Sequence, residues 1–587
     1  MTNHKIKALQ TKMINQGIDL YYLNTSDYHM SEYVPEYFKT IAYFTGFSGS
    51  LASLIISQTE AFIFVDGRYH TQADRQCLKN DVKVVKLGTK GALEPADFII
   101  KNYDNPVVGL DGKRTSISFA KKLRRHNIKI RSIDIYSQLI EDRQPLKKEK
   151  IYELNLRYTG LTRAKKIELV QHCLNGKCHI VNNLESIAYI LNLRSNDILY
   201  TPVFMSYLIF FRNRIYLFCD INRFSKKTVD ALYTDKIIVR PYDTYYKFLT
   251  SISHETVFLD ENKVNYETYL RISSNGNTIY NKRSVIEDMK SIKNAVEQEN
   301  IRLAHISDGI AMLRFLMWID NQDKSTLTEY DVAEKINSFR FENGAVDLSF
   351  NSIVAYNENS AVIHYSPSKN NSARLNNNGV LLVDTGGQYY EGTTDITRTI
   401  ALGPVDDEVK KYFSVVLKSM FNLSEFKFVE GLNGSQVDVI ARKELWSQGL
   451  DYRHGTGHGV GNMLSVHEGP PNIRYMHTSQ ENELVTLCPG MVFSDEPGIY
   501  FEGKFGIRCE NLLLCQNDYE NEYGKFLKFE TLTLVPFDLN LIDIDYLDEE
   551  TIIALNNYHK NVYDTLSPYL SDEENDYLRK LTREIWK

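Results

Sequence analysis

Residues 380–387 read VLLVDTGG, and residues 394–400 read TDITRTI. The first run predicts an apolar strand that ends in a turn, and the second predicts the strand that returns beside it. Asp384 and Asp395 flank the connecting loop, so their carboxylates could face each other across the strand pair. Two carboxylates held close together repel each other unless a positive group lies between them. This strand pair therefore indicates a cation site.

The triplet Asp384-Thr385-Gly386 has a rival interpretation, because the same triplet occurs at the active site of aspartic proteases. Those enzymes need two aspartates that share one proton. This chain contains no second Asp-Thr-Gly or Asp-Ser-Gly triplet. It is also far longer than the subunits of the dimeric enzymes of that kind. We therefore reject the aspartic protease interpretation.

The next informative segment combines histidines with glycines. Residues 454–461 read HGTGHGVG, and His467 follows His458 by nine positions. Two histidines four apart occur on zinc-binding helices, but each glycine costs a helix roughly 1 kcal/mol. The lysine and hydroxyl residues of a phosphate-binding P-loop are not placed correctly either. The glycines instead allow the backbone to pack closely around a site.

Two glutamates beside further strands complete a set of possible metal ligands. Glu496 follows the apolar run 491–493, and Glu510 precedes the apolar run 512–514. The whole set comprises Asp384, Asp395, His458, Glu496 and Glu510. Its four negative charges match two divalent cations, and oxygen-rich ligation with one histidine favours Mn²⁺, Co²⁺ or Zn²⁺. Two metals bridged by carboxylates form a known hydrolytic device.

The composition argues against several other classes of function. The 587 residues include 68 basic and 75 acidic ones, giving a formal net charge of −7. Such a charge favours neither a nucleic-acid partner nor a membrane surface. The first 24 residues lack the apolar core of a secretory signal, and no run approaches the roughly 18 apolar residues of a membrane span. We therefore expect a cytoplasmic protein.

The seven cysteines are consistent with this location, since they are too few and scattered for a disulfide framework. The run from Cys173 to Cys178 and His179 resembles half of a zinc site. It has no second half with ligand spacing. We interpret these cysteines as reduced thiols of the core.

The first half of the chain repeats one pattern of alternating helices and strands. The tripeptide Ile-Ala-Tyr at 41–43 recurs at 187–189, an offset of 187 − 41 = 146 positions. A strand pair that ends at Asp66 has a counterpart that ends at Asp220, an offset of 220 − 66 = 154. These offsets indicate a weak repeat of a whole α/β domain.

Charged segments separate the expected domains. Residues 141–150 predict a linker, and a basic stretch at 281–283 marks the next junction. We therefore expect domains at 1–150, at 151–286 and at 287–587. The last domain is expected to end in a polar helical extension at about 540–587.

The order of the motifs resembles that of the pita-bread metallopeptidases, which include methionine aminopeptidase, prolidase and aminopeptidase P. The matching motifs are D-x10-D, HGTGHGVG, HEGP, DEPG, GIRxEN and Ile363-His364-Tyr365. Segments at 27–33, 44–50, 66–69 and 532–536 look like those of the three-domain cytosolic Xaa-Pro aminopeptidases. The resemblance implies an α/β (α+β) fold, with two related creatinase-like α/β domains before a pita-bread catalytic domain.

The resemblance also implies how the ligands divide between two metals. Asp384 would bind one metal, and Asp395 and Glu510 would bridge both. His458 and Glu496 would complete the second metal. Mn²⁺ is expected ahead of Co²⁺ or Zn²⁺. A hydroxide that bridges the metals would attack the scissile carbonyl.

Further roles follow from the same resemblance. Glu496 would take a proton from the water and pass it to the leaving prolyl nitrogen. His364 and His467 would donate hydrogen bonds to the tetrahedral intermediate. His454, Arg508 and Tyr500 would shape the proline side. An Xaa-Pro bond has no N–H and a fixed φ, so such a pocket would select the ring by shape.

We therefore expect a dinuclear metallo-aminopeptidase that hydrolyses the N-terminal Xaa-Pro bond of peptides. Its partners would be peptides with proline at the second position, and the resemblance suggests a homodimer. A prolidase-type enzyme that acts only on Xaa-Pro dipeptides is one alternative. A non-catalytic pita-bread protein that binds peptides or histones is another. Retention of all five ligand types argues against the second.

Overall fold

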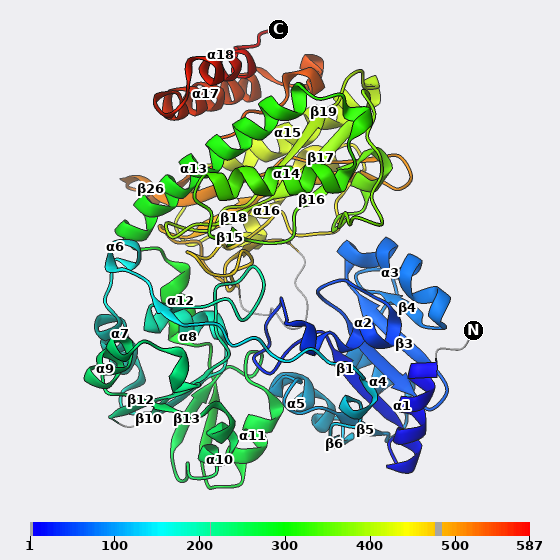
Figure 1. Cartoon of the computed structure of the whole chain (residues 1–587), viewed down its shortest axis with the longest axis vertical. Helices are drawn as coiled ribbons and strands as arrows, with labels where there is room; N and C mark the ends of the chain where they lie inside the picture. The colour runs from blue at the N-terminus through cyan, green and yellow to red at the C-terminus, as the bar shows by residue number, and fades with distance from the viewer. Residues whose placement is uncertain (1–3, 212, 476–483) are drawn as a thin grey trace. The chain divides into compact units, whose positions relative to one another are not determined.

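The computed structural model describes residues 4–211, 213–475 and 484–587. The chain divides into two compact units, Met1–Asp288 and Met289–Lys587 (Figure 1). Among the described helices, none combines the length and apolar character that crossing a bilayer requires.

The first unit contains two six-stranded mixed sheets with the same topology. The first has the order β4-β3-β2-β1-β5-β6, with bounds Lys83–Lys86, Ala61–Val65, Ser53–Ser57, Leu20–Asn24, Val107–Leu110 and Lys129–Ser132. The second has the order β12-β11-β10-β8-β13-β14, with bounds Ile237–Arg240, Arg214–Phe218, Tyr207–Phe211, Cys178–Val181, Thr256–Leu259 and Thr278–Asn281. Corresponding strands pair with the same direction in both sheets. This agreement confirms the repeat predicted from the sequence.

Helices cover both faces of the first sheet, where alternate residues of each strand point to opposite sides and pack in separate clusters. In the first sheet Leu54 and Ile56 pack in one buried cluster, whereas Ile55 packs in the other. The helices of the first repeat are α1 His4–Asn15, α2 Thr40–Thr45, α3 His70–Cys77, α4 Pro95–Asn102 and α5 Ile117–Arg125. Those of the second are α6 Leu156–Thr159, α7 Arg163–Leu174, α8 Leu184–Leu191, α9 Lys226–Thr234, α10 Tyr245–Leu249 and α11 Tyr266–Ser273.

The two repeats meet along a symmetric seam of backbone hydrogen bonds. Ser118 N donates to Glu261 O at 3.0 Å, and Glu267 N donates to Gly112 O at 2.8 Å. The two bonds are equivalent under the repeat. The donors are 267 − 118 = 149 positions apart, and the acceptors are 261 − 112 = 149 positions apart. Ser116 forms a bridge with Asn265, its own counterpart at 265 − 116 = 149. Such reciprocal contacts are the signature of two-fold symmetry.

The second unit surrounds a three-stranded antiparallel sheet, β16-β17-β19, with bounds Ile353–Tyr356, Val380–Thr385 and Ile396–Ala401. Helices α13 (Ala295–Asp320) and α14 (Glu329–Glu342) lie side by side and pack on one face through a shared apolar cluster (Figure 1). Helix α13 begins at Ala295, because Asn294 caps it, and Ile292 stays exposed.

A four-stranded sheet and two ribbons supply the other site strands. The sheet order is β20-β27-β26-β23, with bounds Phe428–Val429, Gly524–Thr531, Asn511–Asn521 and Val492–Asp495. The ribbons are β21 Gly457–His458 with β22 Asn472–Ile473, and β24 Gly498–Phe501 with β25 Phe505–Arg508. Helices α15 (Asp407–Ser424) and α16 (Gly434–Trp446) pack against each other and against this region.

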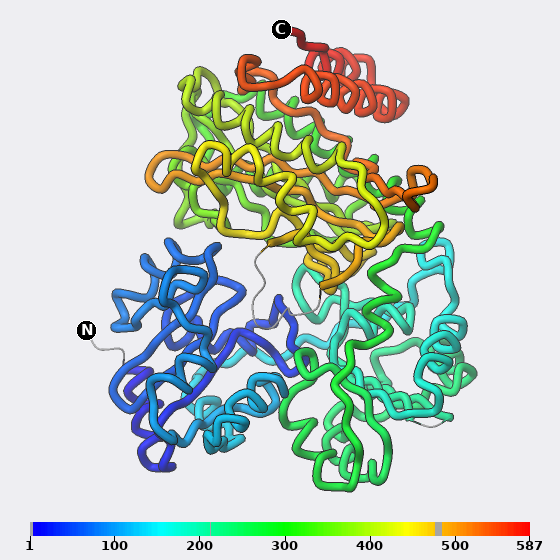
Figure 2. Tube along the Cα trace, turned by 180° about the vertical axis from the view of Figure 1, so that it is seen from behind, coloured from blue at the N-terminus to red at the C-terminus, as the bar shows by residue number. Residues whose placement is uncertain are grey.

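The predicted helical extension is present as α17 (Glu549–Leu566) and α18 (Asp572–Leu581), which lie side by side (Figures 1 and 2). Arg398 of β19 links helix α17 and the segment before it to the strands that carry the site residues. Its buried guanidinium donates to Glu510 O at 2.6 Å, Val535 O at 2.7 Å and Tyr558 Oη at 2.9 Å. One side chain thus joins the residue before β26, the segment after β27 and helix α17.

We predict that Arg398→Met lowers the Tm of the second unit by roughly 6 °C or more. Several buried acceptors would lose their donor, and each costs about 1–3 kcal/mol when left unpaired. Tyr558→Phe is the matched control, because it removes only one hydroxyl of the same network and should lower the Tm by a few degrees. Scanning calorimetry measures both. Equal shifts for the two variants would contradict this role of Arg398.

Candidate metal centre

The ligand-bearing segments are brought together by strand pairing. Asp384 pairs with Thr397 across β17 and β19. Asp395 lies two positions before Thr397, so its side chain lies on the same face as that of Asp384, in a diagonal position. Glu510 joins them because its backbone N–H donates to Thr397 O at 3.2 Å. The return strand β19 begins at Ile396, so Asp395 lies immediately before this strand rather than within it.

Three side chains form a tight group. Ligand atoms of Asp395, His458 and Glu510 all lie within 4.8 Å of one another. His458 Nε2 is 3.5 Å from Asp395 Oδ2 and 3.4 Å from Glu496 Oε1. The other ring nitrogen, Nδ1, lies 2.9 Å from Gly459 O, so Nε2 is the nitrogen directed at the carboxylates. Four of the five predicted ligands thus share one space.

The fifth predicted ligand, Asp384, forms an ion pair with Arg508. Arg508 Nη2 donates to Asp384 Oδ2 at 2.5 Å, and both side chains are buried. The other carboxylate oxygen, Oδ1, has no hydrogen-bond partner among the described residues. Asp384 therefore offers one oxygen to the group while the other is neutralised.

The donor atoms fit divalent cations. Asp395 Oδ1 and Glu510 Oε1 are, like Asp384 Oδ1, buried without a hydrogen-bond partner among the described residues. Buried polar atoms nearly always have partners, so three orphaned oxygens at one place indicate an ion-binding site. Oxygen ligands with one imidazole suit Mn²⁺ and related metals.

Burial and the repulsion between neighbouring carboxylates both shift the pKa values of the groups at this place. Burial raises the pKa of Asp384 to about 7, with Asp395 and Glu496 acting the same way against the effect of Arg508. Burial and the same neighbours hold the pKa of Glu510 well above its usual range. Burial lowers the pKa of His458, but the hydrogen bond to Asp395 and the charge of Glu496 outweigh it and raise it to about 9.

The residues predicted for the proline side form a chain that ends at this group. Arg508 Nη1 donates to Tyr500 Oη at 2.8 Å. Tyr500 Oη lies 2.9 Å from His454 Nε2. Arg508 also reaches Asp384, so a change at His454 can be transmitted to a ligand through two side chains.

The two remaining predicted histidines have different surroundings. The ring of His467 meets that of His458 edge to face, with centroids 4.4 Å apart. His364 is half-buried and follows the short helix η8 (Asn357–Ala361). Ser360 of that helix accepts a hydrogen bond from Gly506 N at 2.6 Å, two residues before Arg508. The roles of both histidines stay predictions.

Two hydroxyls that position ligands were not predicted from the sequence. Thr397 Oγ1 donates to Glu510 Oε2 at 2.7 Å. Ser494 Oγ accepts from His458 N at 3.0 Å and donates to Glu496 Oε1 at 3.1 Å. Thr397 follows Asp395 by two positions and Ser494 precedes Glu496 by two, and this same-face spacing is the signal that could have found them.

Buried charges also fix the segments that carry the histidines. Arg442 of α16 pairs with Asp438 at 2.7 Å and donates to His454 O at 2.7 Å, so it orders the start of the glycine-rich segment. Glu468, next to His467, pairs with Lys293 at 2.6 Å, and both are almost fully buried. The pair of Lys293 with Glu468 could not be predicted, because its members are far apart in the sequence. Asp438 and Arg442 have the four-residue spacing of a helical ion pair, but the contact with His454 O depends on tertiary packing.

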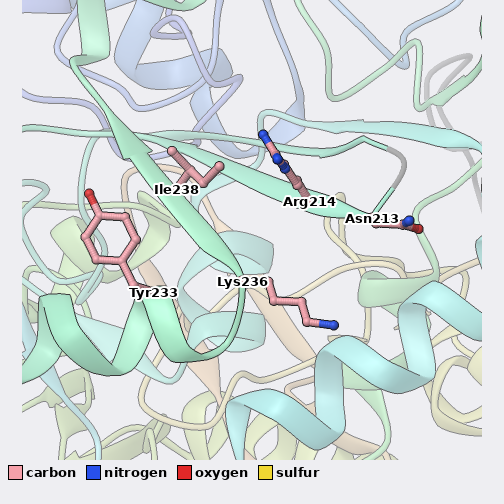
Figure 3. A pocket seen from close by; sticks show the side chains of 5 residues that line it. All are labelled: Asn213, Arg214, Tyr233, Lys236 and Ile238. Atoms are coloured by element: carbon pink, nitrogen blue, oxygen red, sulfur yellow. The ribbon is translucent and has the colours of Figure 1, made fainter.

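A surface hollow of the first unit offers no comparable chemistry. It is lined by Asn213, Arg214, Tyr233, Lys236 and Ile238 (Figure 3). The charged ends of Arg214 and Lys236 point in different directions. They do not converge on one ligand position.

Family models match the chain over nearly its whole length. Metallopeptidase family M24 matches residues 299–517, and the C-terminal region of peptidase_M24 matches 525–585. Two models of the Creatinase/Prolidase N-terminal domain match 5–143 and 142–297.

Relatives match at similar breadth. Probable Xaa-Pro aminopeptidase P of Aspergillus flavus is 33% identical, over 100% of this chain and 93% of the relative. Xaa-Pro aminopeptidase 1 of Dictyostelium discoideum is 33% identical, over 97% and 94%. The X-prolyl aminopeptidase of Caenorhabditis elegans, described as a cytosolic enzyme with a di-nuclear active site, aligns with a TM-score of 0.92 and 30% identity over 99% of each chain. An Xaa-Pro dipeptidase from Bacillus anthracis covers only 64% of this chain at 21% identity, with a TM-score of 0.51.

The fold and the site together define a metallopeptidase. The chain belongs to the M24 metallopeptidases, and within them to the Xaa-Pro aminopeptidase family. The predicted fold class and the family resemblance are thereby confirmed.

We predict that Thr397→Val weakens metal binding about 10- to 100-fold, because Glu510 loses the hydroxyl that orients it. Thr399→Val is the matched control. Thr399 lies on the same strand and is equally buried, but its hydroxyl accepts from Arg508 N and donates to Arg508 O instead. Metal titration by calorimetry compares the two variants. A similar loss in both would contradict the specific role of Thr397.

We also predict that the metal-free protein loses stability as the pH rises from about 4 to about 9. Asp384 and His458 both have raised pKa values in the folded state, so the folded protein binds protons that the unfolded chain releases. Bound metal replaces these protons, so the Tm difference between metal-loaded and metal-free protein should widen with pH.

Scanning calorimetry between pH 5 and pH 8, with chelator or with Mn²⁺, measures this difference. The variant Asp384→Asn lacks one titrating group, so its metal-free Tm should depend less on pH than that of the wild type. A Tm gap that narrows as the pH rises would contradict the assignment of these residues as the ligands.

Proposed function

We propose that the protein removes the N-terminal residue from peptides whose second residue is proline. One observation carries the proposal: three buried carboxylate oxygens, which have no hydrogen-bond partner in the described part of the chain, gather beside His458 and next to the chain formed by Arg508, Tyr500 and His454. Full-length similarity to Xaa-Pro aminopeptidases supports this substrate class.

Asp384, Asp395, His458, Glu496 and Glu510 would bind two divalent cations, with Mn²⁺ ahead of Co²⁺ or Zn²⁺. When bound, such cations polarise a carbonyl group and make water a stronger acid. The orphaned oxygens Asp384 Oδ1, Asp395 Oδ1 and Glu510 Oε1 support this ligand set.

Glu496 is the residue suited to move the proton. Its side chain is 20% exposed, more than those of Asp384 and Asp395, so it can meet both water and substrate. Ser494 donates to Oε1, which leaves Oε2 for a proton from the attacking water. Glu496 then delivers this proton to the prolyl nitrogen, which becomes a better leaving group once protonated.

His467 and His364 would donate hydrogen bonds to the carbonyl oxygen as it gains negative charge. The edge-to-face contact with His458 supports a place for His467 beside the reacting bond. Hydrogen-bond donors aimed at a developing charge act most strongly where burial excludes water.

The proline of the substrate has no backbone N–H to donate. The protein therefore has to recognise the ring by its shape and the peptide by its carbonyl group. Tyr500 contributes a ring whose hydroxyl stays protonated at neutral pH. Burial raises its pKa to about 12, although Arg508 opposes the rise. His454 and Arg508 fix the position of this ring from two sides.

We further propose that the protein is a cytoplasmic homodimer with domains at 1–150, 151–286 and 287–587. The description of the C. elegans relative as cytosolic supports the location. The two repeated sheets support a division of the first unit into two domains.

The test is a cleavage panel with purified protein. The substrates are an Xaa-Pro-Pro tripeptide, a longer Xaa-Pro peptide, an Xaa-Pro dipeptide and a matched Xaa-Ala peptide. We expect release of the first residue from the tripeptide and the longer peptide, little release from the Xaa-Ala peptide, loss of activity with chelator, and the greatest recovery with Mn²⁺. Liquid chromatography with mass spectrometry identifies the products.

Two outcomes favour the alternatives. Cleavage of the dipeptide alone would identify a prolidase-type enzyme, and peptide binding without cleavage in the presence of each metal would identify a non-catalytic protein. Full activity of Asp395→Asn would contradict the mechanism. Glu530→Gln serves as the control variant, because Glu530 pairs with Arg302 outside the ligand set.

A further inference from the structure

A buried carboxylate outside the ligand set organises the segment that carries His364. Glu329 is the first residue of α14 and is fully buried. An ionised carboxylate can only accept hydrogen bonds, and it is costly to bury unless donors surround it. The position of Glu329 therefore requires donors on every side.

Four neutral donors meet this carboxylate, and all of them come from residues 356–373. Oε1 accepts from Tyr356 N at 2.7 Å and from Asn359 Nδ2 at 2.9 Å. Oε2 accepts from Tyr365 Oη at 2.6 Å and from Ala373 N at 2.7 Å. One side chain thus fixes both ends and the middle of an 18-residue stretch, since 373 − 356 + 1 = 18.

His364 lies inside this stretch, between two of the donors. Asn359 precedes it by five positions, and Tyr365 is the next residue. The two donors also contact each other, because Asn359 Nδ2 lies 3.2 Å from Tyr365 Oη. The backbone at His364 is therefore restrained by the carboxylate through its immediate neighbour.

The same stretch is also bonded to two strands that carry residues of the candidate metal centre. Ser360 accepts from Gly506 N at 2.6 Å on the strand that carries Arg508. Asn357 Oδ1 accepts from Val380 N at 2.9 Å on the strand that carries Asp384. The stretch 356–373 therefore contacts Glu329 as well as the strands that carry Arg508 and Asp384.

We propose that Glu329 is a positioning residue that sets the geometry of His364 through the stretch 356–373. The proposal rests on the function proposed above, in which His364 donates to the carbonyl oxygen in the transition state. A displaced donor weakens transition-state stabilisation more than substrate binding. Removal of the carboxylate therefore lowers kcat and leaves KM nearly unchanged.

The test is a double-mutant cycle of Glu329→Gln with His364→Ala, measured as kcat on an Xaa-Pro-Pro peptide with Mn²⁺. A Gln side chain has one acceptor and one donor end, so it cannot accept all four hydrogen bonds. We expect Glu329→Gln alone to lower kcat about 10- to 100-fold, with KM changed by less than about twofold. In the His364→Ala background the same change should cost less than about threefold.

A gentler variant covers the case in which Glu329→Gln does not fold. Tyr365→Phe removes one donor and keeps the ring, and it should lower kcat about 3- to 10-fold in the same cycle. Tyr356→Phe is the matched control. Among the residues that the structure describes, its hydroxyl donates hydrogen bonds only to Asn378. The carboxylate is bound by the backbone N–H of Tyr356, so kcat should not change.

A second readout does not depend on activity. In protein labelled with ¹⁵N-histidine, Glu329→Gln should shift the ring signals that His364→Ala removes and leave the signals of His454 and His467 in place. An equal loss of kcat in both backgrounds, or an unchanged His364 signal, would overturn the proposal. A wild type inactive on every Xaa-Pro peptide would overturn the proposed function instead, and the histidine signal would then decide on Glu329.

Discussion

Mutual repulsion between carboxylates is the constraint on which the second unit depends. Asp384, Asp395 and Glu510 are buried side by side, where water cannot solvate their charges. The scaffold therefore has to be stable against this repulsion before any cation binds. Close backbone packing provides part of that stability. A Cβ on Gly457 would lie 1.9 Å from Ser494 O, and a Cβ on Gly506 would lie 2.0 Å from Ser360 O. Only glycine allows these segments to approach so closely.

The ligands are oriented mainly by neutral groups, and this division has a chemical reason. Thr397 and Ser494 donate hydroxyl hydrogens to Glu510 and Glu496, which orients the carboxylates without neutralising them. Arg508 is the exception, and it contacts the oxygen of Asp384 that is opposite the unpartnered one. A cation among the ligands themselves would compete with the metals. Glu329 follows the same rule, since its four donors are all neutral.

The sequence identified the candidate ligands, which the structure brings together, but not the groups that support them. Asp384, Asp395 and His458 belong to motifs whose chemistry is readable without a structure, and the strands beside them follow from apolar patterning. Glu329 and Arg442 lie in ordinary helical sequence, and tertiary packing supplies the donors of Glu329 and the contact of Arg442 with His454 O. The offsets of 146 and 154 also hid the offset of 149 at the seam, since loops of different length separate the strands.

The symmetric seam of the first unit has a consequence for how its two repeats diverge. Each backbone hydrogen bond there has a counterpart 149 positions away. An insertion within the seam segment of either repeat would therefore break hydrogen bonds that join the two repeats. Side chains can change freely as long as that register is kept, because the bonds use only main-chain atoms. Selection can therefore erase the similarity of the two halves residue by residue while the spacing of the seam is preserved. In two repeats of this kind, the similarity is therefore preserved in the spacing of 149 positions rather than in the identity of the residues.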